Sequence, residues 1–213
     1  MYNLQISYQM SDKLSYPAWK RLMDVFGSIS GIALTIPFFP IIAIAIKLDT
    51  EGPIFVRLDR ISAGRTIKVY KFRSMVKDAK FRKESLEPLN ERKDGCFFKM
   101  KNDPRVTRVG RLLRKLRVDE VPQFLNVLKG EMALVGPRPH EPLEVSRYPK
   151  EYAHISSAVA GITGVSQVSG ASSLKWLDEL ALDDFYVNNR SPGLDMWVIM
   201  RTINIFVSDP TGV

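Results

Sequence analysis

The stretch from Val25 to Ile46 constrains this chain most, because it contains 22 consecutive residues without a charge. An α-helix rises ~1.5 Å per residue, so this length is enough to cross the ~30 Å hydrocarbon layer of a bilayer. Pro37 and Pro40 fall just past its middle and remove backbone donors from the helix. A membrane helix with a sharp bend is therefore expected.

Basic residues lie on both sides of this stretch. Two precede it and several follow it: Lys20 and Arg21, then Lys47, Arg57, Arg60 and Arg65. Because basic residues collect on the cytoplasmic side of a membrane, both ends are expected there. A re-entrant helix, which enters the bilayer, bends and returns to the same face, satisfies both the flanks and the prolines. A bent helix that spans the bilayer is the alternative, and a cleaved signal fits less well because its apolar core has only about 7 to 15 residues.

The net charge of +8, with a pI near 9.6, implies an anionic partner: nucleic acid, lipid headgroups or a phosphorylated small molecule. The chain contains no dinucleotide or P-loop fingerprint and no groove-reading motif, which disfavours nucleic acid. Cys96 is the only cysteine, so an intramolecular disulfide is impossible. His140 and His154 lack the spacing of paired zinc ligands.

An arginine-rich helix is expected within the segment from Asn102 to Pro139. Four apolar residues recur there at helical spacing, namely Val109, Leu112, Leu113 and Leu116. The basic residues among them are expected mainly on the other side of the helix. Pro122 cannot continue this helix and suits the first turn of a second one, which Gly130 would cap.

Asp119 and Glu120 lie at the predicted corner between these two helices. The dipole of the second helix and the nearby arginines favour ionised carboxylates, whereas two adjacent carboxylates raise each other's pKa. One carboxylate is expected to stay charged, and the other to have a tunable pKa. This segment alone supports two interpretations equally: a structural cap neutralised by arginines, or a functional acid pair.

A β-hairpin is predicted after the membrane stretch, with a turn at Gly64 and apolar residues alternating from Ile67 to Met75. Lys68, Lys71 and Arg73 alternate with these apolar residues. They form either a solvated edge or a row of cations that faces phosphate.

Two prolines bracket Arg138 in the run Gly136-Pro137-Arg138-Pro139. Proline fixes the backbone dihedral φ, so this turn would present a guanidinium rigidly, as phosphate binding requires. A proline-braced turn with a surface arginine is the alternative.

The expected fold is α+β. Residues 1–18 form an irregular segment, 19–50 the re-entrant membrane helix, and 51–213 a mostly helical cytoplasmic domain with a small β-hairpin or sheet and interfacial amphipathic helices. Within that domain, 76–95 is a charged exposed insert, 96–101 a strand, and 176–189 an acidic amphipathic helix. The apolar tail from Leu194 to Val207 either lies on a membrane surface or closes the core.

Several motifs taken together resemble the bacterial sugar transferase family, the monotopic phosphoglycosyl transferases that begin membrane-bound glycan assembly. In order they are KRLMD, KVYKFRSM, the whole run from Asn102 to Pro139, GITGVSQVSG and LDDFYV. The resemblance extends from about Trp19 to Phe206. It implies an enzyme at the cytoplasmic face of the bacterial inner membrane that transfers a sugar phosphate from a UDP-sugar to polyprenyl (undecaprenyl) phosphate.

The resemblance also implies roles for individual residues. Asp119 would be the nucleophile, forming an aspartyl phosphosugar, and Glu120 an acid/base group or, with Asp119, a ligand of Mg²⁺. Cations around the phosphorus would offset the charge that gathers there. The candidate phosphate contacts are Lys71, Arg73, Arg117 and Arg138.

The chain departs from the family pattern in places. Val159 and Ala160 stand where Arg-Pro is common, Val165 where tryptophan is frequent, and Ala171 where arginine is frequent. These departures leave the identity of the nucleotide sugar undecided. The sequence also does not decide which glycan is built or whether the chain forms a homodimer. The chain ends soon after the family core, which is expected of a small member without extra N-terminal membrane helices. The alternative to an enzyme is a non-catalytic basic protein that binds anionic lipids.

Overall fold

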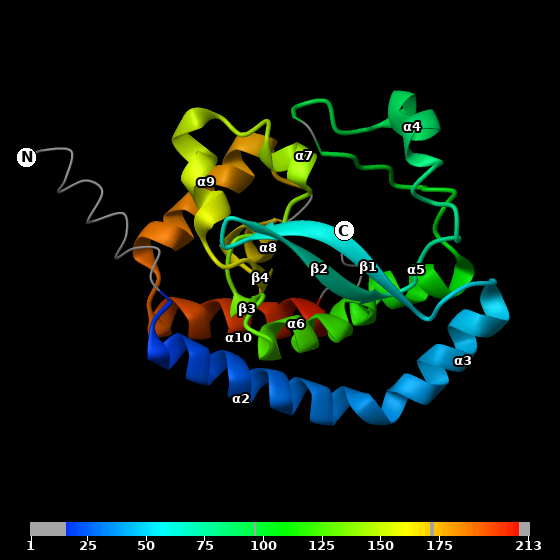
Figure 1. Cartoon of the computed structure of the whole chain (residues 1–213), viewed down its shortest axis with the longest axis horizontal. Helices are drawn as coiled ribbons and strands as arrows, with labels where there is room; N and C mark the ends of the chain where they lie inside the picture. The colour runs from blue at the N-terminus through cyan, green and yellow to red at the C-terminus, as the bar shows by residue number, and fades with distance from the viewer. Residues whose placement is uncertain (1–15, 96, 171–172, 209–213) are drawn as a thin grey trace, which may run out of the picture.

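The computed structural model describes residues 16–95, 97–170 and 173–208. The apolar stretch folds as two helices, α2 (Ala18–Thr35) and α3 (Phe39–Asp49), separated by one 3₁₀ turn, η1 (Ile36–Phe38). Pro37 lies in this turn and Pro40 at the start of α3. The predicted bend is confirmed, and Figure 1 shows it along one edge of the molecule. Residues 1–15 of the predicted irregular segment lie outside the described residues.

The burial pattern of α2 is the reverse of that of a soluble helix. Its buried residues are Lys20, Asp24 and Ser28, which share one face at a spacing of four residues. Large apolar side chains of α2, η1 and α3 are exposed instead: Leu22, Phe26, Ile29, Leu34, Ile36, Phe38, Ile41, Ile44 and Leu48. Among the described residues, Ala18–Asp49 is the one helical stretch long and apolar enough to cross a membrane. An apolar outer surface of this kind suits contact with lipid.

The predicted hairpin is confirmed as strands β1 (Phe55–Ser62) and β2 (Arg65–Phe72), which pair antiparallel. The two turn residues, Ala63 and Gly64, have φ values of 50° and 71°. A two-residue turn with both φ values positive matches the twist of paired strands, which fixes the register.

The arginine-rich segment differs from the prediction in where it turns. It folds as α5 (Arg108–Lys115), the 3₁₀ segment η3 (Val118–Gln123) and α6 (Phe124–Leu128). The corner lies at Arg117, whose φ of 52° is left-handed. Pro122 lies within η3 and does not begin the second helix, because the chain has already turned before it. Gly130 follows α6 with φ of 75°, as predicted for the residue after a helix.

The predicted apolar stripe of α5 is only partly correct. Leu113 is buried in a cluster with Ile46 and Phe72, whereas Leu112 and Leu116 are 56% and 43% exposed. The helix and the residue that follows it therefore each carry a leucine on the outer side together with the cations.

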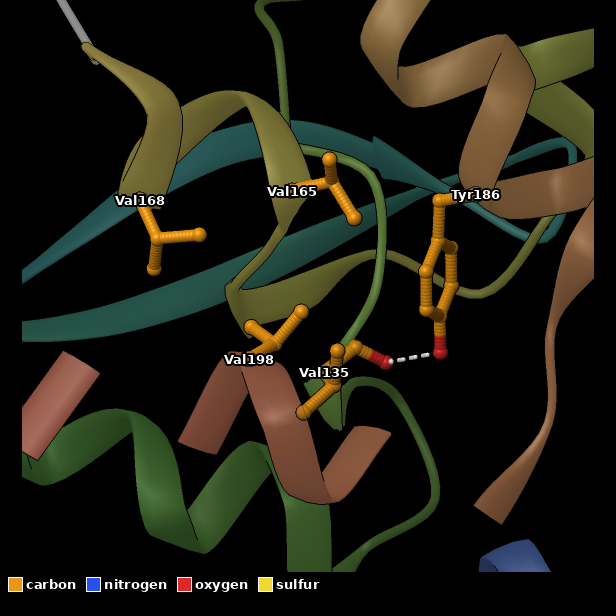
Figure 2. Packing of buried hydrophobic residues seen from close by; sticks show 5 residues of the cluster. All are labelled: Val135, Val165, Val168, Tyr186 and Val198. Carbon is orange, nitrogen blue, oxygen red and sulfur yellow. Dashed lines mark hydrogen bonds between the residues drawn. The ribbon is translucent and has the colours of Figure 1, made fainter. Parts of the chain in front are cut away.

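The second half of the chain is built around a short parallel pair, β3 (Ala133–Val135) with β4 (Gly161–Thr163). Around it are α7 (Pro142–Val145), η4 (Lys150–Ser157), α8 (Val165–Ser169), α9 (Trp176–Asn189) and α10 (Pro192–Ser208). Figure 2 shows the core between β3, α8, α9 and α10, with Val135, Val165, Val168, Tyr186 and Val198 packed together. The α10 helix closes this core through Val198 and exposes Met196, Met200 and Ile203 on its other side. The prediction that the tail closes the core is confirmed, whereas contact of its exposed apolar side with a membrane surface stays a prediction.

The charged insert is mostly exposed and contains two short helical turns, α4 (Lys83–Leu86) and η2 (Glu87–Leu89). Its end is nevertheless attached to α9, because Arg92 donates to Glu179 Oε2 at 3.0 Å and Asp94 accepts from the Trp176 amide at 2.5 Å. The prediction of a strand over 96–101 is wrong for 97–101, which have no regular structure, and Cys96 lies outside the described residues.

Arg73 fastens the end of α3 to the hairpin. It is 3% exposed, and its Nη1 and Nη2 donate to the carbonyl oxygens of Glu51, Thr50 and Ile46 at 2.6, 2.6 and 3.2 Å. The guanidinium therefore satisfies carbonyls that the end of a helix leaves without partners.

We predict that Arg73→Met destabilises the protein by about 2 to 4 kcal/mol, because a charged donor is lost and buried carbonyls are left unpaired. Lys68→Met on the same strand is the matched control, since Lys68 is 61% exposed and its pair with Asp59 contributes little. Thermal unfolding in detergent measures both variants. Equal Tm values for the two would contradict the capping role.

Candidate active site

Asp119 and Glu120 form the first turn of η3, directly after the left-handed corner at Arg117. Asp119 is 6% exposed, whereas the side chain of Glu120 is 29% exposed. The corner thus separates the two neighbours into a buried carboxylate and a partly solvated one.

Lys71 of β2 contacts this pair. Its Nζ lies 2.5 Å from Glu120 Oε1, and its side chain is 23% exposed. The alternation of β2 places Lys71 on the same face as the buried residues Ile67 and Val69, toward η3. The hairpin prediction therefore led to a residue of the site.

The two carboxylates have opposite pKa shifts. Burial raises the pKa of Asp119, and the negative charge of Glu120 raises it further. The positive charges of Lys71 and Arg114 lower this pKa but do not outweigh the other two effects. Burial also acts to raise the pKa of Glu120, but Lys71, Arg138 and Arg117 outweigh it and hold the pKa below its usual range. The expectation of one charged carboxylate and one tunable carboxylate agrees with these directions, with Glu120 as the charged member.

Arg138 reaches the pair from the loop after β3. The backbone of this loop is held by β4, because Gly136 N donates to Thr163 O at 2.9 Å and Gly161 N donates to Pro137 O at 2.8 Å. A Cβ at Gly161 would lie 2.1 Å from Gly136 N, so the close approach of the two segments requires glycine there. The side chain of Arg138 is exposed, and its charge acts on Glu120.

Two more arginines of the arginine-rich segment lie beside the pair. Arg117 acts on Glu120, and its Cζ lies 5.9 Å from the centre of the Phe206 ring. Arg114 was not singled out from the sequence, yet its charge acts on Asp119 while its Nε donates to Ser74 Oγ at 2.9 Å. Its position one turn before the corner was the available signal.

The geometry does not support the fourth candidate phosphate contact, Arg73. Its guanidinium is buried and bound to carbonyl oxygens at the end of α3. The site therefore brings together Lys71, Arg117 and Arg138 from the predicted set, and adds Arg114.

The sequence did not reveal that acids of α9 lie behind the Arg138 loop. Glu179 and Asp183 are 3% and 1% exposed, although the helix was expected to be acidic on its outer face. Burial raises the pKa of Asp183 to about 7. The two acids are four residues apart, and Tyr186 and Val187 of the buried face follow three and four residues after Asp183. This helical spacing was the signal that both acids point inward.

The predicted Mg²⁺ site can be tested against the donor set. Within the described residues, no group of three or more His, Cys, Asp or Glu side chains could hold a metal. Mg²⁺, however, is commonly bound by one or two carboxylates, with substrate phosphates and water completing its octahedron. Asp119 and Glu120 fit this mode, in which the ion arrives with the substrate.

Comparison with known proteins gives a consistent result. The family model described as bacterial sugar transferase matches residues 15–209. A UDP-galactose-lipid carrier transferase of Erwinia amylovora is 37% identical over 190 residues, covering 87% of this chain and 40% of the relative. An undecaprenyl-phosphate galactose phosphotransferase of Salmonella typhimurium is 36% identical over 190 residues, covering 87% of this chain and 40% of the relative.

The match also includes relatives of similar length. Exopolysaccharide production protein PSS of Rhizobium leguminosarum is 37% identical over 196 residues, covering 86% of this chain and 92% of the relative. The chain spans less than half the length of the Erwinia and Salmonella relatives. The range matched by the family model contains all the described residues, including both carboxylates of the site. The chain belongs to the bacterial sugar transferase family.

Proposed function

We propose that this chain transfers a sugar phosphate from a UDP-sugar to polyprenyl phosphate, undecaprenyl phosphate in bacteria. The transfer takes place at the cytoplasmic membrane face and begins the synthesis of a membrane-linked glycan. The names of the relatives support this class of reaction. The observation that carries the proposal is the buried Asp119 beside Glu120, with Lys71, Arg114, Arg117 and Arg138 around them.

The reaction proceeds in two displacements at phosphorus. In the first, a carboxylate oxygen of Asp119 attacks the phosphorus that bears the sugar, the bond to the bridging oxygen breaks, and UMP leaves with that oxygen. In the second, a phosphate oxygen of the lipid attacks the aspartyl phosphosugar, and Asp119 regains its carboxylate. A nucleophile that forms a covalent intermediate divides one difficult exchange between polyanions into two easier ones.

The cations of the site offset the negative charge that both displacements gather. Arg138 presents a guanidinium from a fixed loop, and a fixed donor needs no reorganisation when the charge develops. Lys71 keeps Glu120 charged, so that Glu120 can accept a proton or contact the metal ion. Mg²⁺, held by the two carboxylates together with the diphosphate, would supply further charge neutralisation.

The membrane stretch gives the lipid substrate access to this site. We propose that α2 and α3 form a re-entrant helix, because their outer surface is apolar and basic residues flank both ends. The exposed apolar face of α10 would lie in the interface beside them. A polyprenyl chain can then stay in the bilayer while its phosphate reaches Asp119.

The alternative is a non-catalytic protein that holds anionic lipids on its basic surface. Such a protein has no use for a buried carboxylate with a raised pKa, since burying an acid costs stability without adding affinity for anions. The arrangement around Asp119 favours catalysis for this reason.

We predict that Asp119→Asn lowers UMP release by about 10³-fold or more, because the amide cannot form the covalent intermediate. The assay uses detergent-solubilised protein with Mg²⁺, polyprenyl phosphate and a panel of UDP-sugars, which also identifies the sugar. Mass spectrometry without the lipid acceptor detects the phosphosugar adduct. Asp59→Asn, on the hairpin surface, is the control. Transfer by Asp119→Asn at near wild-type rate would refute covalent catalysis by this residue.

We further predict that both ends of the membrane helix face the cytoplasm. Single cysteines at Ala18 and Glu51, both exposed, are introduced after Cys96→Ser and treated with an impermeant maleimide. Neither is expected to react in intact cells, and both are expected to react after permeabilisation. Reaction of only one of them in intact cells would mean a spanning helix.

A further inference from the structure

The outer side of α5 is not used by the proposed reaction. Arg108, Arg111, Leu112 and Lys115 recur at i, i+3, i+4 and i+7, so they share one face of the helix. All four are exposed, and Leu112 is 56% exposed. The face therefore combines three cations with a large apolar side chain.

The three cations of this face have no acid partner among the described residues. The α5 helix contains no Asp or Glu, and none of the three takes part in an ion pair there. Some exposed cations elsewhere are paired, as Lys68 is with Asp59 at 2.5 Å and Arg82 with Asp78 at 2.7 Å. The positive charge of α5 is thus available to a partner outside this chain.

Both ends of α5 are joined to apolar surfaces that the membrane proposal places in lipid. Val109 N, at its start, donates to Asp49 Oδ2 at the end of α3, at 2.9 Å. Just beyond its end, Arg117 lies against Phe206 of α10, whose exposed residues include Met200 and Ile203. Figure 1 shows α5, α6 and α10 next to the bent helix.

We propose that this face of α5 binds the headgroups of anionic phospholipids. Its cations would pair with lipid phosphates, while Leu112 and the neighbouring Leu116 would lie among the upper acyl chains. Each cation near an anionic surface contributes attraction that neutral headgroups do not offer. The proposal rests on the membrane location given above but not on the transfer reaction.

The test compares two charge-matched variants of the full-length chain. Arg111→Gln with Lys115→Gln removes one Arg and one Lys from α5. Arg147→Gln with Lys150→Gln removes the same charges from exposed positions next to α7, on the side of the molecule away from α2 in Figure 1. Native mass spectrometry from micelles with equal phosphatidylglycerol and phosphatidylcholine measures the ratio of retained lipids.

Wild type and the α7 variant are expected to retain phosphatidylglycerol preferentially. The α5 variant is expected to lose about 10- to 30-fold of this preference, since each cation contributes about 1 kcal/mol at an anionic surface. An unchanged preference in the α5 variant, or an equal loss in both variants, would overturn the proposal. Displacement of the lipid by excess soluble glycerol phosphate would also overturn it, because the face would then be a site for small anions. The lipid ratio does not depend on UMP release, so failure of the proposed function is seen separately.

A different observation concerns the back of the Arg138 loop. Asp183 accepts the Arg138 amide at 3.1 Å through Oδ2 and the Ser166 hydroxyl at 2.7 Å through Oδ1. It is 1% exposed, whereas Arg138 is exposed. We infer that Asp183 is a positioning residue, which acts on the substrate phosphate only through Arg138. This inference rests on the proposed function.

A double-mutant cycle tests this inference by UMP release and by UDP affinity. In the wild-type background, Asp183→Ala is expected to lower kcat/KM about 10- to 100-fold, as loss of a supporting hydrogen bond does at other sites. In the Arg138→Met background, the same change is expected to lower kcat/KM by less than about threefold. Asp183→Asn is expected to restore most of the activity, because its amide oxygen can accept from the Arg138 amide while its NH2 group donates to Ser166 Oγ. Independent effects of the Asp183 and Arg138 changes would overturn the inference. Wild-type protein without UMP release would instead refute the proposed function.

Discussion

The buried ion cluster between α2 and α10 is the contact on which the arrangement of this protein depends. Lys20 Nζ lies 3.1 Å from Asp24 Oδ1 and 2.8 Å from Asp195 Oδ2, and all three side chains are almost fully buried. Asp24 also accepts the amide of Leu134, in β3, at 2.7 Å. Buried charges must be paired, so breaking one partner would leave the others uncompensated. The membrane helix is thereby fixed to the strand that leads into the Arg138 loop.

This attachment explains how distant segments meet at one site. Tyr186 of α9 donates to Asp195 and contacts Val135 O, so that α9, α10 and β3 share one polar connection inside an apolar core. Arg73 makes the equivalent connection at the other end of the bent helix. Lys71, Asp119 and Arg138 of the site each come from a different element: β2, η3 and the loop after β3. The transfer proposed above would require such anchoring, because a lipid substrate cannot leave the bilayer to find a displaced site.

The elements that depend on local patterns could be predicted from the sequence. The hairpin follows from alternation and a glycine turn, the bend from two prolines, and the helix over 176–189 from its periodicity. The corner at Arg117 could not be predicted, because a left-handed arginine is intrinsically unfavourable and is imposed by tertiary contacts. The inward direction of Glu179 and Asp183 was missed because acids are normally solvated, and here their partners come from distant segments.

The three cations around β2 illustrate where sequence reasoning stops. Lys68, Lys71 and Arg73 were expected to act alike, yet one pairs on the surface, one contacts the acid pair and one holds the end of a helix. Alternation separates Lys68 from the other two, since Ile67 and Val69 mark the inner face. It cannot separate Lys71 from Arg73, because only the elements opposite them differ: η3 offers carboxylates, whereas the end of α3 offers carbonyl oxygens. The role of a cation on this strand is therefore decided by the acceptors that the fold brings to it.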